Sequence, residues 1–446
     1  MSIQLRRDIA TSWTNTDPTL AEGEFGMETD TGKIKIGDGT NTWTSLNYLA
    51  TTVSPPDWSS VTQEAKIQSS DIASGDNFSY DVDISTDGNT VAVGSLLGTS
   101  DSQKGAGYIF TRSGTTWSQE AKLQPSDVAA SDYVGTAISI SGDGNTLVIN
   151  ARGHDSGQTN AGAAYIFTRS GTTWSQEAKL VASSQGQYYN FGVDVAISRD
   201  GDTVVVGSDG DSTGGAQAGS AYVFTRSGTT WSQQAYIQCS DRAANDYFGQ
   251  YLEVSSNGND AIIGVRNKSG GGAAYVFTRS GTTWSQQAKI VSSDLQTGDD
   301  FGANVDISDD GATVIVGATN EDTGATNVGA AYIFTRSGTT WSQQQKIQAS
   351  DKEIYDNFGA TVGLDTTGDL AIVGARYEDT DYGNAGAAYV FTRDGTTWSQ
   401  ESKITPTDSA RASNDQFGTS LAICSNTAIV GGWYVEGKGA AYIFTA

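Results

Sequence analysis

The residues best suited to chemistry in this sequence are aspartates that recur in pairs. Variants of the pattern S-D-x-x-x-x-D-x-F-G contain Asp71/Asp76, Asp127/Asp132, Asp241/Asp246, Asp294/Asp299, Asp351/Asp356 and, with a longer gap, Asp408/Asp415. Two facing carboxylates at a defined separation are what a glycoside hydrolase needs. Aspartates ahead of a strand also accept backbone N–H bonds in turns. Because an active site is usually asymmetric, the repetition favours this structural role, and we predict no catalytic residue. The lone His154 has no partner nearby in sequence and is interpreted as a surface loop residue.

Aromatic and charged residues in irregular polar segments form a second set of candidates. Tyrosine and tryptophan provide a large contact area at a low entropy cost, so they suit binding surfaces. Solvated loop positions are the alternative interpretation for each residue. The ligand-binding candidates are Tyr377, Glu378, Asp379, Tyr382, Trp433, Tyr434, Arg266, Lys268, Asn320, Glu321 and Asp322.

An internal repeat organises the sequence around these residues. The string GAAYIFTRSGTTWSQ at Gly329 recurs almost unchanged at Gly162, Gly219 and Gly272. The tryptophans that close the motif are spaced by 59, 57, 57, 53, 57 and 57 residues, from Trp58 to Trp398. A fixed period of this size indicates a repeat architecture of seven units over residues 58–446.

Each unit contains four short segments rich in Val, Ile, Tyr, Phe or Thr and bounded by Gly, Asp, Asn or Ser. In one unit these are FGANVDIS at Phe301, TVIVGA at Thr313, GAAYIF at Gly329 and WSQQQKIQ at Trp341. Such segments are typical of strands A, B, C and D joined by turns, and Gly338 suits a hairpin of three or more residues. The predicted fold is all-β, a seven-bladed β-propeller of four-stranded antiparallel blades. Residues 58–68 are expected to pair with residues 439–446 and so close the ring, because the last unit lacks its own strand D.

The two ends of the blades differ in sequence. The A–B turns, such as STDGNT at Ser85, and the C–D turns, RSGTT or RDGTT, barely change, whereas the B–C segments vary in length and letters. Variation on one face of a rigid scaffold is typical of a binding surface. The linker enters strand D from the uniform end, so we expect the variable face to point away from residues 1–48.

The strand motifs identify a family resemblance. The F-G of strand A, as at Phe358, the V-G-A that ends strand B, as at Val316, and the following G-A-A-Y-[IV]-F resemble the FG-GAP repeats of integrin α-type propellers. In those repeats, calcium loops of the form D-x-D-x-D-G-x-x-D lie between strands A and B. The corresponding turns here offer too few carboxylates for the six to eight oxygens that calcium prefers, so we predict no metal site and no cofactor.

Residues 1–48 have no counterpart in the repeats. The string EFGMETDTGKIKIGDG from Glu24 closely resembles the N-terminal module of phage tail-fibre and tropism-determinant proteins. The resemblance implies a virion-anchoring module at the attached end of a trimeric fibre. So small a module buries little apolar surface alone, which fits packing on sister chains, with a small cap on the propeller as the alternative. Residues 49–57, with Pro55 and Pro56, are interpreted as a stiff linker.

Composition limits the partners. A net charge of −25 argues against binding nucleic acid or an anionic membrane. The sequence contains no apolar run of about 20 residues, so no membrane insertion is expected. Cys239 and Cys424 lie in different units without metal-like spacing and are interpreted as free buried thiols.

Together these patterns predict a phage fibre or adhesin subunit, made in the host cytoplasm and located in the virion. We expect a homotrimer through the N-terminal module, contacts with other virion proteins, and binding of the propeller to a host cell-surface glycan or protein. The alternatives are a decoration protein that packs on virion proteins and, less favoured, a propeller glycan depolymerase.

Overall fold

The chain of 446 residues divides into two compact units, residues 1–57 and residues 58–446. The structure is a computed structural model, and it describes residues 5–8, 12, 15–21, 24–28, 34–37, 39–46, 56–96, 104–380, 383–407 and 411–446.

The first unit contains a small sheet. Strand β1 (Leu5–Asp8) pairs in parallel with β2 (Phe25–Glu28), and β2 pairs antiparallel with β3 (Ile34–Ile36). Its described core is Leu20 and Trp43, the latter at the start of the 3-10 turn η1 (Trp43–Ser45). The ammonium of Lys35 donates a 2.7 Å hydrogen bond to the Trp43 carbonyl and lies 4.9 Å from the centroid of its ring. This core is small, as expected for so short a segment.

The second unit consists of seven four-stranded antiparallel sheets, which we number as blades in chain order. Blade 1 comprises β5 (Phe78–Ile84), β6 (Thr90–Ser95), β7 (Ala106–Ser113) and β8 (Thr116–Leu123). Blade 2 comprises β9 (Val134–Ile140), β10 (Thr146–Ala151), β11 (Ala163–Ser170) and β12 (Thr173–Leu180). Blade 3 comprises β13 (Val195–Ile197), β14 (Thr203–Ser208), β15 (Ser220–Ser227) and β16 (Thr230–Ile237).

Blade 4 comprises β17 (Tyr251–Val254), β18 (Asp260–Val265), β19 (Ala273–Ser280) and β20 (Thr283–Ile290). Blade 5 comprises β21 (Phe301–Ile307), β22 (Thr313–Ala318), β23 (Ala330–Ser337) and β24 (Thr340–Ile347). Blade 6 comprises β25 (Phe358–Leu364), β26 (Leu370–Ala375), β27 (Ala387–Asp394) and β28 (Thr397–Ile404). Blade 7 comprises β29 (Phe417–Cys424), β30 (Thr427–Gly432), β31 (Ala440–Thr445) and, from the start of the unit, β4 (Thr62–Ile67).

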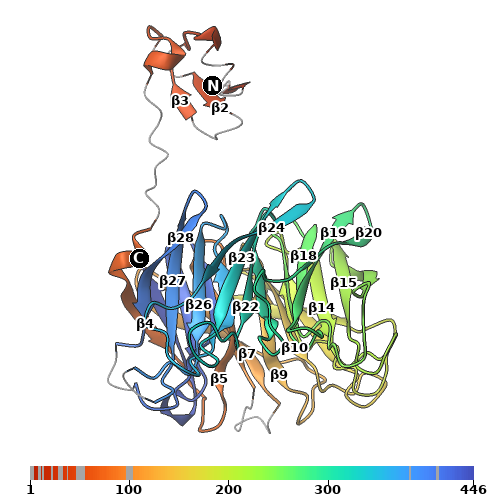
Figure 1. Ribbon diagram of the computed structural model, residues 1–446. Helices are drawn as coiled ribbons and strands as arrows, with labels where there is room; N and C mark the ends of the chain where they lie inside the picture. The colour runs from red at the N-terminus through yellow and green to blue at the C-terminus, as the bar shows by residue number, and fades with distance from the viewer. Residues whose placement is uncertain are drawn as a thin grey trace. The chain divides into compact units, whose positions relative to one another are not determined.

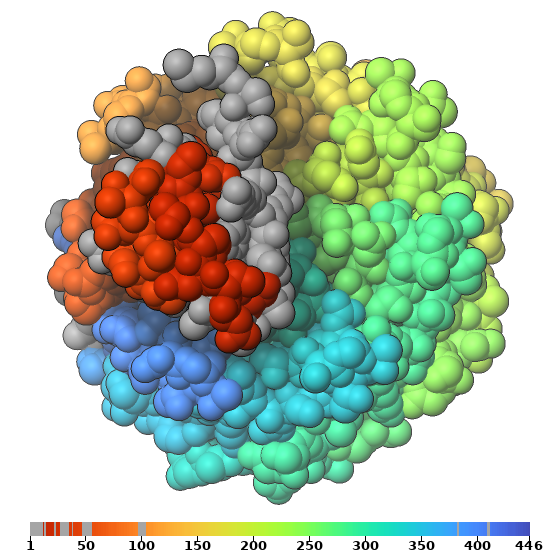
Figure 2. Space-filling view, turned by 90° about the horizontal axis from the view of Figure 1, so that it is seen from above, coloured from red at the N-terminus to blue at the C-terminus, as the bar shows by residue number. Residues whose placement is uncertain are grey.

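The predicted seven-bladed propeller is therefore confirmed. Within each blade the strands follow the order A, B, C and D, and the blades follow one another around the ring in sequence order, as the colours of Figure 2 show. Figure 1 places β4, the first strand of the unit, beside the strands that end the chain. Strand β4 pairs with β31, with Ile67 opposite Ala441 and Thr62 opposite Thr445.

Apolar residues fill the space between neighbouring blades. Strand B is buried along its whole length, for example Thr313–Ala318 in blade 5. The phenylalanine of the F-G motif, replaced by Val134 in blade 2, is buried in these interfaces. The ring of Phe358 lies 5.6 Å from that of Tyr389 and 6.0 Å from that of Phe391 in its own blade, measured between centroids. Its backbone pairs with Gly329 of the preceding blade, where a Cβ atom would come within 2.1 Å of the Phe358 carbonyl. Only glycine fits this approach, which explains the G before A-A-Y-[IV]-F.

The W-S-Q end of the repeat joins adjacent blades. The indole N–H of Trp117 donates to Glu64 of the preceding strand D at 2.8 Å, and Trp174 donates to Glu120 at 2.8 Å. The glutamine of the same motif accepts a backbone N–H from the loop that leaves the preceding blade, as Gln400 does from Ser350 at 2.9 Å. Every blade repeats these letters because every blade must hold the one before it.

The glutamine contact recurs at the point of closure, whereas the first tryptophan has a different acceptor. Gln63 on β4 accepts the backbone N–H of Thr407 at 2.7 Å. Trp58, in the 3-10 turn η2 (Trp58–Ser60), is 1% exposed and donates to the Ser425 carbonyl at 3.2 Å. Blade 7 is thus a sheet made from segments at opposite ends of the propeller sequence.

The C–D hairpin is tighter than the sequence predicted. Ser337 pairs with Thr340, which leaves two residues in the turn instead of three or more. Gly338 has a φ of 62°, and Thr339 is not among the residues with positive φ. A glycine at the first position of a two-residue turn matches the right-handed twist of the flanking strands.

Two further predictions concern the sulfur atoms and the membrane. Cys239 and Cys424 are buried free thiols, as predicted. Among the residues that the structure describes, none of the helices has the length and apolar character needed to cross a membrane.

Candidate functional site

The blades present two different faces. The uniform face carries the A–B and C–D turns, and the other, which we call the loop face, carries the B–C and D–A loops. The aspartate of an A–B turn is occupied by its own turn: Asp87 accepts from the Ser85 hydroxyl at 2.6 Å and from the Asn89 backbone at 3.0 Å. Within the described ranges, no group of three or more acidic, histidine or cysteine residues is arranged to hold a metal ion.

The paired aspartates of the D–A loops hold these loops in place, and the second member of each pair accepts the backbone N–H bond that was predicted. The first member binds a lysine on strand D of the next blade, as Asp351 does with Lys403 at 2.7 Å. The second closes its own loop, as Asp356 does by accepting the backbone N–H of Glu353 at 2.6 Å. Asp408 lies outside the described residues, and its partner in sequence, Asp415, accepts the backbone N–H of Ala412 at 2.6 Å.

Three charged candidates from the B–C loops are buried in ion pairs. Glu378 has no exposed surface and binds Lys403 at 2.8 Å and Arg411 at 3.4 Å. Lys268 is 6% exposed and binds Asp246 at 2.8 Å. These side chains hold the B–C loops against the blade instead of facing solvent, so we exclude them from the candidate binding site.

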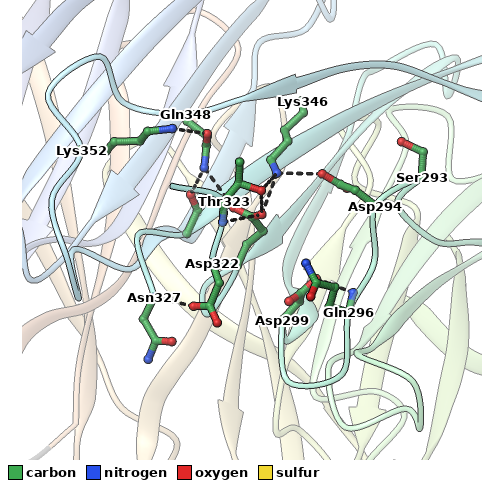
Figure 3. Close-up of polar contacts among 12 residues, drawn as sticks. Ser293, Asp294, Gln296, Asp299, Asp322, Thr323, Asn327, Lys346, Gln348 and Lys352 are labelled. Atoms are coloured by element: carbon green, nitrogen blue, oxygen red, sulfur yellow. Dashed lines mark hydrogen bonds and ion pairs between the residues drawn. The ribbon is translucent and has the colours of Figure 1, made fainter. Parts of the chain in front are cut away.

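Glu321 shows the same arrangement in blade 5, and its partners Lys346 and Gln348 are labelled in Figure 3. Its carboxylate is 2% exposed and accepts from Lys346 at 2.7 Å and from Gln348 at 3.0 Å. Lys346 also binds Asp294 of the D–A loop at 2.8 Å. Lys346 therefore holds both the B–C loop and the D–A loop against strand D. Because Glu321 is buried in this ion pair, we exclude it from the candidate binding site.

His154 occupies the corresponding place in blade 2, which corrects its interpretation as an unpartnered surface residue. Its Nδ1 lies 2.9 Å from the Ser156 hydroxyl, and its Nε2 lies 3.2 Å from the Lys179 ammonium and 3.6 Å from Asp127. The loop folds back onto strand D, a contact between distant segments that local sequence did not indicate.

The remaining candidates are dispersed over the loop face. Asp322 is exposed and accepts the Asn327 backbone N–H at 2.7 Å, and Asn320 donates to Asp300 at 2.8 Å. Tyr377 is half-buried under Arg376, whose guanidinium carbon lies 4.8 Å from its ring centroid. Asp379 is exposed, Tyr434 is 46% exposed, and Tyr382 lies outside the described residues. These positions do not converge on one cavity.

Arg266 and Trp433 do converge, at a cavity of about 280 Å³ where the central channel meets the loop face. We call this cavity the funnel. Its rim is made by the residue that directly follows strand B, a position occupied in blades 1 to 7 by Leu96, Arg152, Asp209, Arg266, Thr319, Arg376 and Trp433. Five of these seven line the cavity: Arg152, Arg266, Thr319, Arg376 and Trp433.

Tyrosines from strand A complete the wall of the funnel. Tyr80 stacks on Trp433 with a centroid separation of 4.4 Å, and Trp433 donates its indole N–H to the Tyr80 carbonyl at 3.2 Å. Tyr251 lies under Arg266, 5.7 Å from the guanidinium carbon to the ring centroid. Arginine side chains and flat aromatic rings therefore surround the same opening.

The floor of the funnel consists of acidic side chains that hold neighbouring A strands together. Asp194 accepts the backbone N–H of Val195 in its own blade at 2.9 Å and that of Leu252 in the next blade at 2.8 Å. Asp81 does the same with Val82 at 3.0 Å and Ile138 at 2.8 Å. These bonds satisfy N–H groups on the inner edge of each sheet, which no further strand covers.

The same arrangement continues in the deeper channel, a cavity of about 140 Å³. Asp306 bridges Ile307 and Leu364, each at 2.6 Å. Removal from bulk water raises the pKa of Asp81 to about 8, and the neighbouring charge of Asp194 adds to this shift. Burial likewise raises the pKa of Asp194 and of Asp306 to about 7. Burial therefore favours the protonated form of these carboxyls.

Sequence reasoning missed Arg152, Arg376, Tyr80 and Tyr251. A signal for the rim was present, because the residue after strand B differs between successive blades, whereas strand B itself is small and apolar in nearly every blade. Arg152 and Arg376 stand in B–C segments of the variable face, but only their convergence in space distinguishes them from other loop residues. Tyr80 and Tyr251 stand at unequal positions of strand A, and the period alone does not predict which of them faces the channel.

The fold and the divergent loop face define the class of protein, a seven-bladed β-propeller with a separate N-terminal module. The FG-GAP repeat model matches residues 61–110, 117–167, 174–224, 231–277, 284–334, 341–391 and 398–444. The chain belongs to the FG-GAP repeat family. Residues 3–41 match the Major tropism determinant N-terminal domain, so both resemblances seen in the sequence are confirmed.

Two phage proteins are partly similar to the chain. One is a hyaluronoglucosaminidase of Streptococcus pyogenes phage H4489A, 49% identical over 49 residues, which are 11% of this chain and 13% of that protein. The other is a hyaluronoglucosaminidase of Streptococcus pyogenes phage H10403, 37% identical over 67 residues, which are 15% of this chain and 19% of that protein. The chain thus spans less than a fifth of either relative.

Proposed function

We propose that the protein is a fibre or adhesin subunit of a phage virion whose propeller binds a host-surface glycan through its loop face. The observation that carries this proposal is the match of residues 3–41 to the Major tropism determinant N-terminal domain, in the same chain as a propeller with one divergent face. Repeats that are uniform in their framework and different at the rim of one cavity fit a scaffold whose specificity lies in that face.

The N-terminal module would attach the subunit to other virion proteins and associate three chains. The small described core, Leu20 and Trp43, supports this role because burial against sister chains would supply the apolar contacts that the module lacks. A protein assembled into the virion in this way would be made in the host cytoplasm.

A glycan depolymerase is the second candidate. Two phage relatives carry the name hyaluronoglucosaminidase, and Asp81 and Asp194 are carboxyls of raised pKa at the floor of a cavity, a combination found at active sites. We favour binding over hydrolysis because both oxygens of each carboxylate accept backbone N–H groups, one in its own blade and one in the next. A decoration role, with the propeller packed on virion proteins, is the third possibility.

Binding of the purified full chain to a panel of bacterial strains and to their extracted surface polysaccharides tests the proposal. The Trp433→Ala/Tyr434→Ala variant should bind at least tenfold more weakly. Asp394→Ser is the matched control, because it places on the uniform face the serine found in the same turn of other blades. Release of reducing sugar without lasting binding would favour the depolymerase. No binding by folded, assembled wild type would favour the decoration role.

A further inference from the structure

The arginines of the funnel differ from most others in the propeller. Those of the C–D hairpins are matched with acceptors, as Arg169 is with Glu120 at 2.5 Å and Arg336 with Asp260 at 2.7 Å. Arg199, in the channel, donates to the Ile84 carbonyl at 2.8 Å and lies 3.7 Å from Asp309. In a chain of net charge −25, an arginine has no shortage of carboxylates to pair with.

Within the described part of the chain, no hydrogen bond or ion pair links the guanidinium of Arg152, Arg266 or Arg376 to another residue. The Nε atoms of Arg266 and Arg376 are buried without an acceptor. The contacts of these side chains are aromatic instead: Arg152 lies 5.4 Å from the ring of Tyr133, Arg266 faces Tyr251, and Arg376 faces Tyr377. A buried donor without a partner is costly, so this arrangement indicates that an acceptor comes from outside the chain.

Nearby carboxylates do not fill this role. Asp209, at the rim position between Arg152 and Arg266 in blade order, accepts from Asn190 at 3.1 Å. Asp300 accepts from Asn320 at 2.8 Å. The floor carboxylates Asp81 and Asp194 are turned toward backbone N–H groups of the A strands. The positive charge of the rim is therefore compensated only at longer range.

We propose that the funnel binds one anionic sugar residue of a polysaccharide, whose carboxylate or phosphate is held by Arg152, Arg266 and Arg376 while its ring stacks on the Tyr80–Trp433 pair. This inference deepens the proposed function and rests on it for its biological meaning. Guanidinium groups match planar carboxylates and phosphates through paired, charge-assisted hydrogen bonds.

The dimensions and composition of the funnel suit such a ligand. Its volume of about 280 Å³ lies near the lower end of ligand pockets, roughly 300–1,000 Å³, so it admits one sugar unit of a longer chain. The apolar C–H face of a pyranose packs on flat aromatic surfaces such as that of Trp433. Arginines at alternate blades, 2, 4 and 6, provide hydrogen-bond donors on several sides of the opening.

Calorimetric titration of the full chain tests the inference. The probes are a polyuronate, the same polymer after carboxyl reduction, a phosphorylated dextran, and neutral dextran. We expect the polyuronate or the phosphate polymer to bind, and their comparison distinguishes the source of the anion. The reduced polymer and dextran should bind at least tenfold more weakly. Equal binding of the reduced polymer, or no binding of either anionic polymer, would overturn the inference.

Charge-matched variants locate the site. Arg266→Gln and Arg376→Gln should each weaken binding of the anionic polymer about tenfold or more. Arg242→Gln removes the same charge from an exposed D–A loop residue that does not line the funnel, and its binding should equal that of wild type. Unchanged melting temperatures establish that the funnel variants are folded. Equal losses in all three variants would indicate a diffuse charge effect and refute the funnel.

The cell-binding assay separates this inference from the proposed function. If wild type binds cells and the funnel variants bind equally well, the adhesin proposal stands and the funnel assignment is wrong. If wild type binds anionic polymers through the funnel but binds no cells, the funnel assignment stands and the adhesin proposal is wrong.

Discussion

The indole of Trp433 lies flat on the ring of Tyr80, with 4.4 Å between the ring centroids and 7° between the ring planes. Trp433 follows the second strand of blade 7 and Tyr80 belongs to the first strand of blade 1, so the stack spans the closing interface of the ring. We predict that the pair stabilises this interface beyond its buried area. Aromatic pairs contribute about 0.5–1.5 kcal/mol in this way.

A double-mutant cycle of Tyr80→Ala and Trp433→Ala, measured by denaturant unfolding, gives that coupling energy. Tyr434→Ala is the control, because the neighbouring tyrosine is 46% exposed and has no ring partner among the described residues. Simple additivity of the Tyr80 and Trp433 effects would contradict the prediction.

Removal of residues 57–68 should open blade 7. The deletion removes β4 from its pairing with β31, Trp58 from the core shared with blade 6, and the Gln63 bond to Thr407. We expect a fall in melting temperature of more than about 10 °C, since several kcal/mol are lost and each shifts the midpoint by about 2–4 °C in a large domain. A chain that lacks residues 1–50 but keeps β4 should melt as the full chain does. Equal melting of both truncated chains would refute the role of β4.

Glu378→Ala should destabilise the propeller strongly. Its carboxylate has no exposed surface and binds Lys403 and Arg411. Its removal takes this anion away from both cations and leaves a buried cavity. Loss of one partner of a buried ion pair costs about 3–5 kcal/mol. Asp379→Ala, at the exposed neighbouring position, is the matched control and should change the free energy of unfolding by less than about 0.5 kcal/mol. Similar costs for the two would show that Glu378 is not structural.

The free energy of unfolding should fall as pH rises from 5 to 8. Asp81, Asp194 and Asp306 have pKa values of about 8, 7 and 7 in the folded chain, against 3.8 as the usual value. Between these values the folded state binds more protons than the unfolded state, so their contribution is full below pH 3.8 and is lost as pH rises through 7 to 8. Carboxyls with lowered pKa act in the opposite direction, but only at more acidic pH. Burial raises the pKa of Asp241, yet hydrogen bonds from Lys289 and Tyr275 bring it down to about 2.

Asp194→Asn tests the origin of this dependence. Asparagine is compatible with the position, because Asn304 occupies it in blade 5 and accepts the Val362 backbone N–H at 2.9 Å. The variant should lose less stability between pH 5 and pH 8 than wild type, by about 1 kcal/mol or more, since one unit of pKa corresponds to about 1.4 kcal/mol. Denaturant unfolding at pH 5, 6.5 and 8 measures the effect. An unchanged slope would show that Asp194 does not titrate in this range.

Light scattering should show three chains per particle for the full protein and one for residues 58–446, because the N-terminal module is the proposed site of association. Salt titration up to 1 M provides the control, since an apolar interface resists screening. A monomer in both cases would contradict trimer formation, and a trimer in both would move the interface to the propeller.

The propeller was predictable because the residues that repeat with a fixed period are the same residues that form and connect the strands. The F-G, V-G-A and W-S-Q segments recur at fixed spacing, and each has a local reason, such as the contact of Gly329 with Phe358 or the bond from Trp117 to Glu64. The packing between blades repeats together with the sequence, so the repeat pattern of the sequence was enough to predict the fold. The two-residue C–D turn was missed because turn length depends on which residues pair, not on composition.

The binding site was less predictable, because it depends on convergence around a ring. Glu378 and Glu321 carry the chemistry expected of surface ligands, yet each is buried beneath a lysine from strand D. Arg266 and Trp433 were selected for their side chains alone, and only the ring brings them to one opening with Arg152 and Arg376. No spacing along the chain encodes the arrangement of residues from blades 2, 4, 6 and 7 around one cavity.

The pairing of β4 with β31 also determines when, during synthesis of the chain, the ring can close. The ribosome produces β4 before any blade and its partner only after six blades have been made. At about 5–20 residues per second, β4 waits roughly 20–80 s with its backbone groups unpaired. During that interval β4 can pair with an incorrect strand, including β31 of another chain synthesised on the same messenger RNA. Ring closure within one chain is therefore a competition with exchange between chains, and its outcome depends on how quickly the last blade emerges.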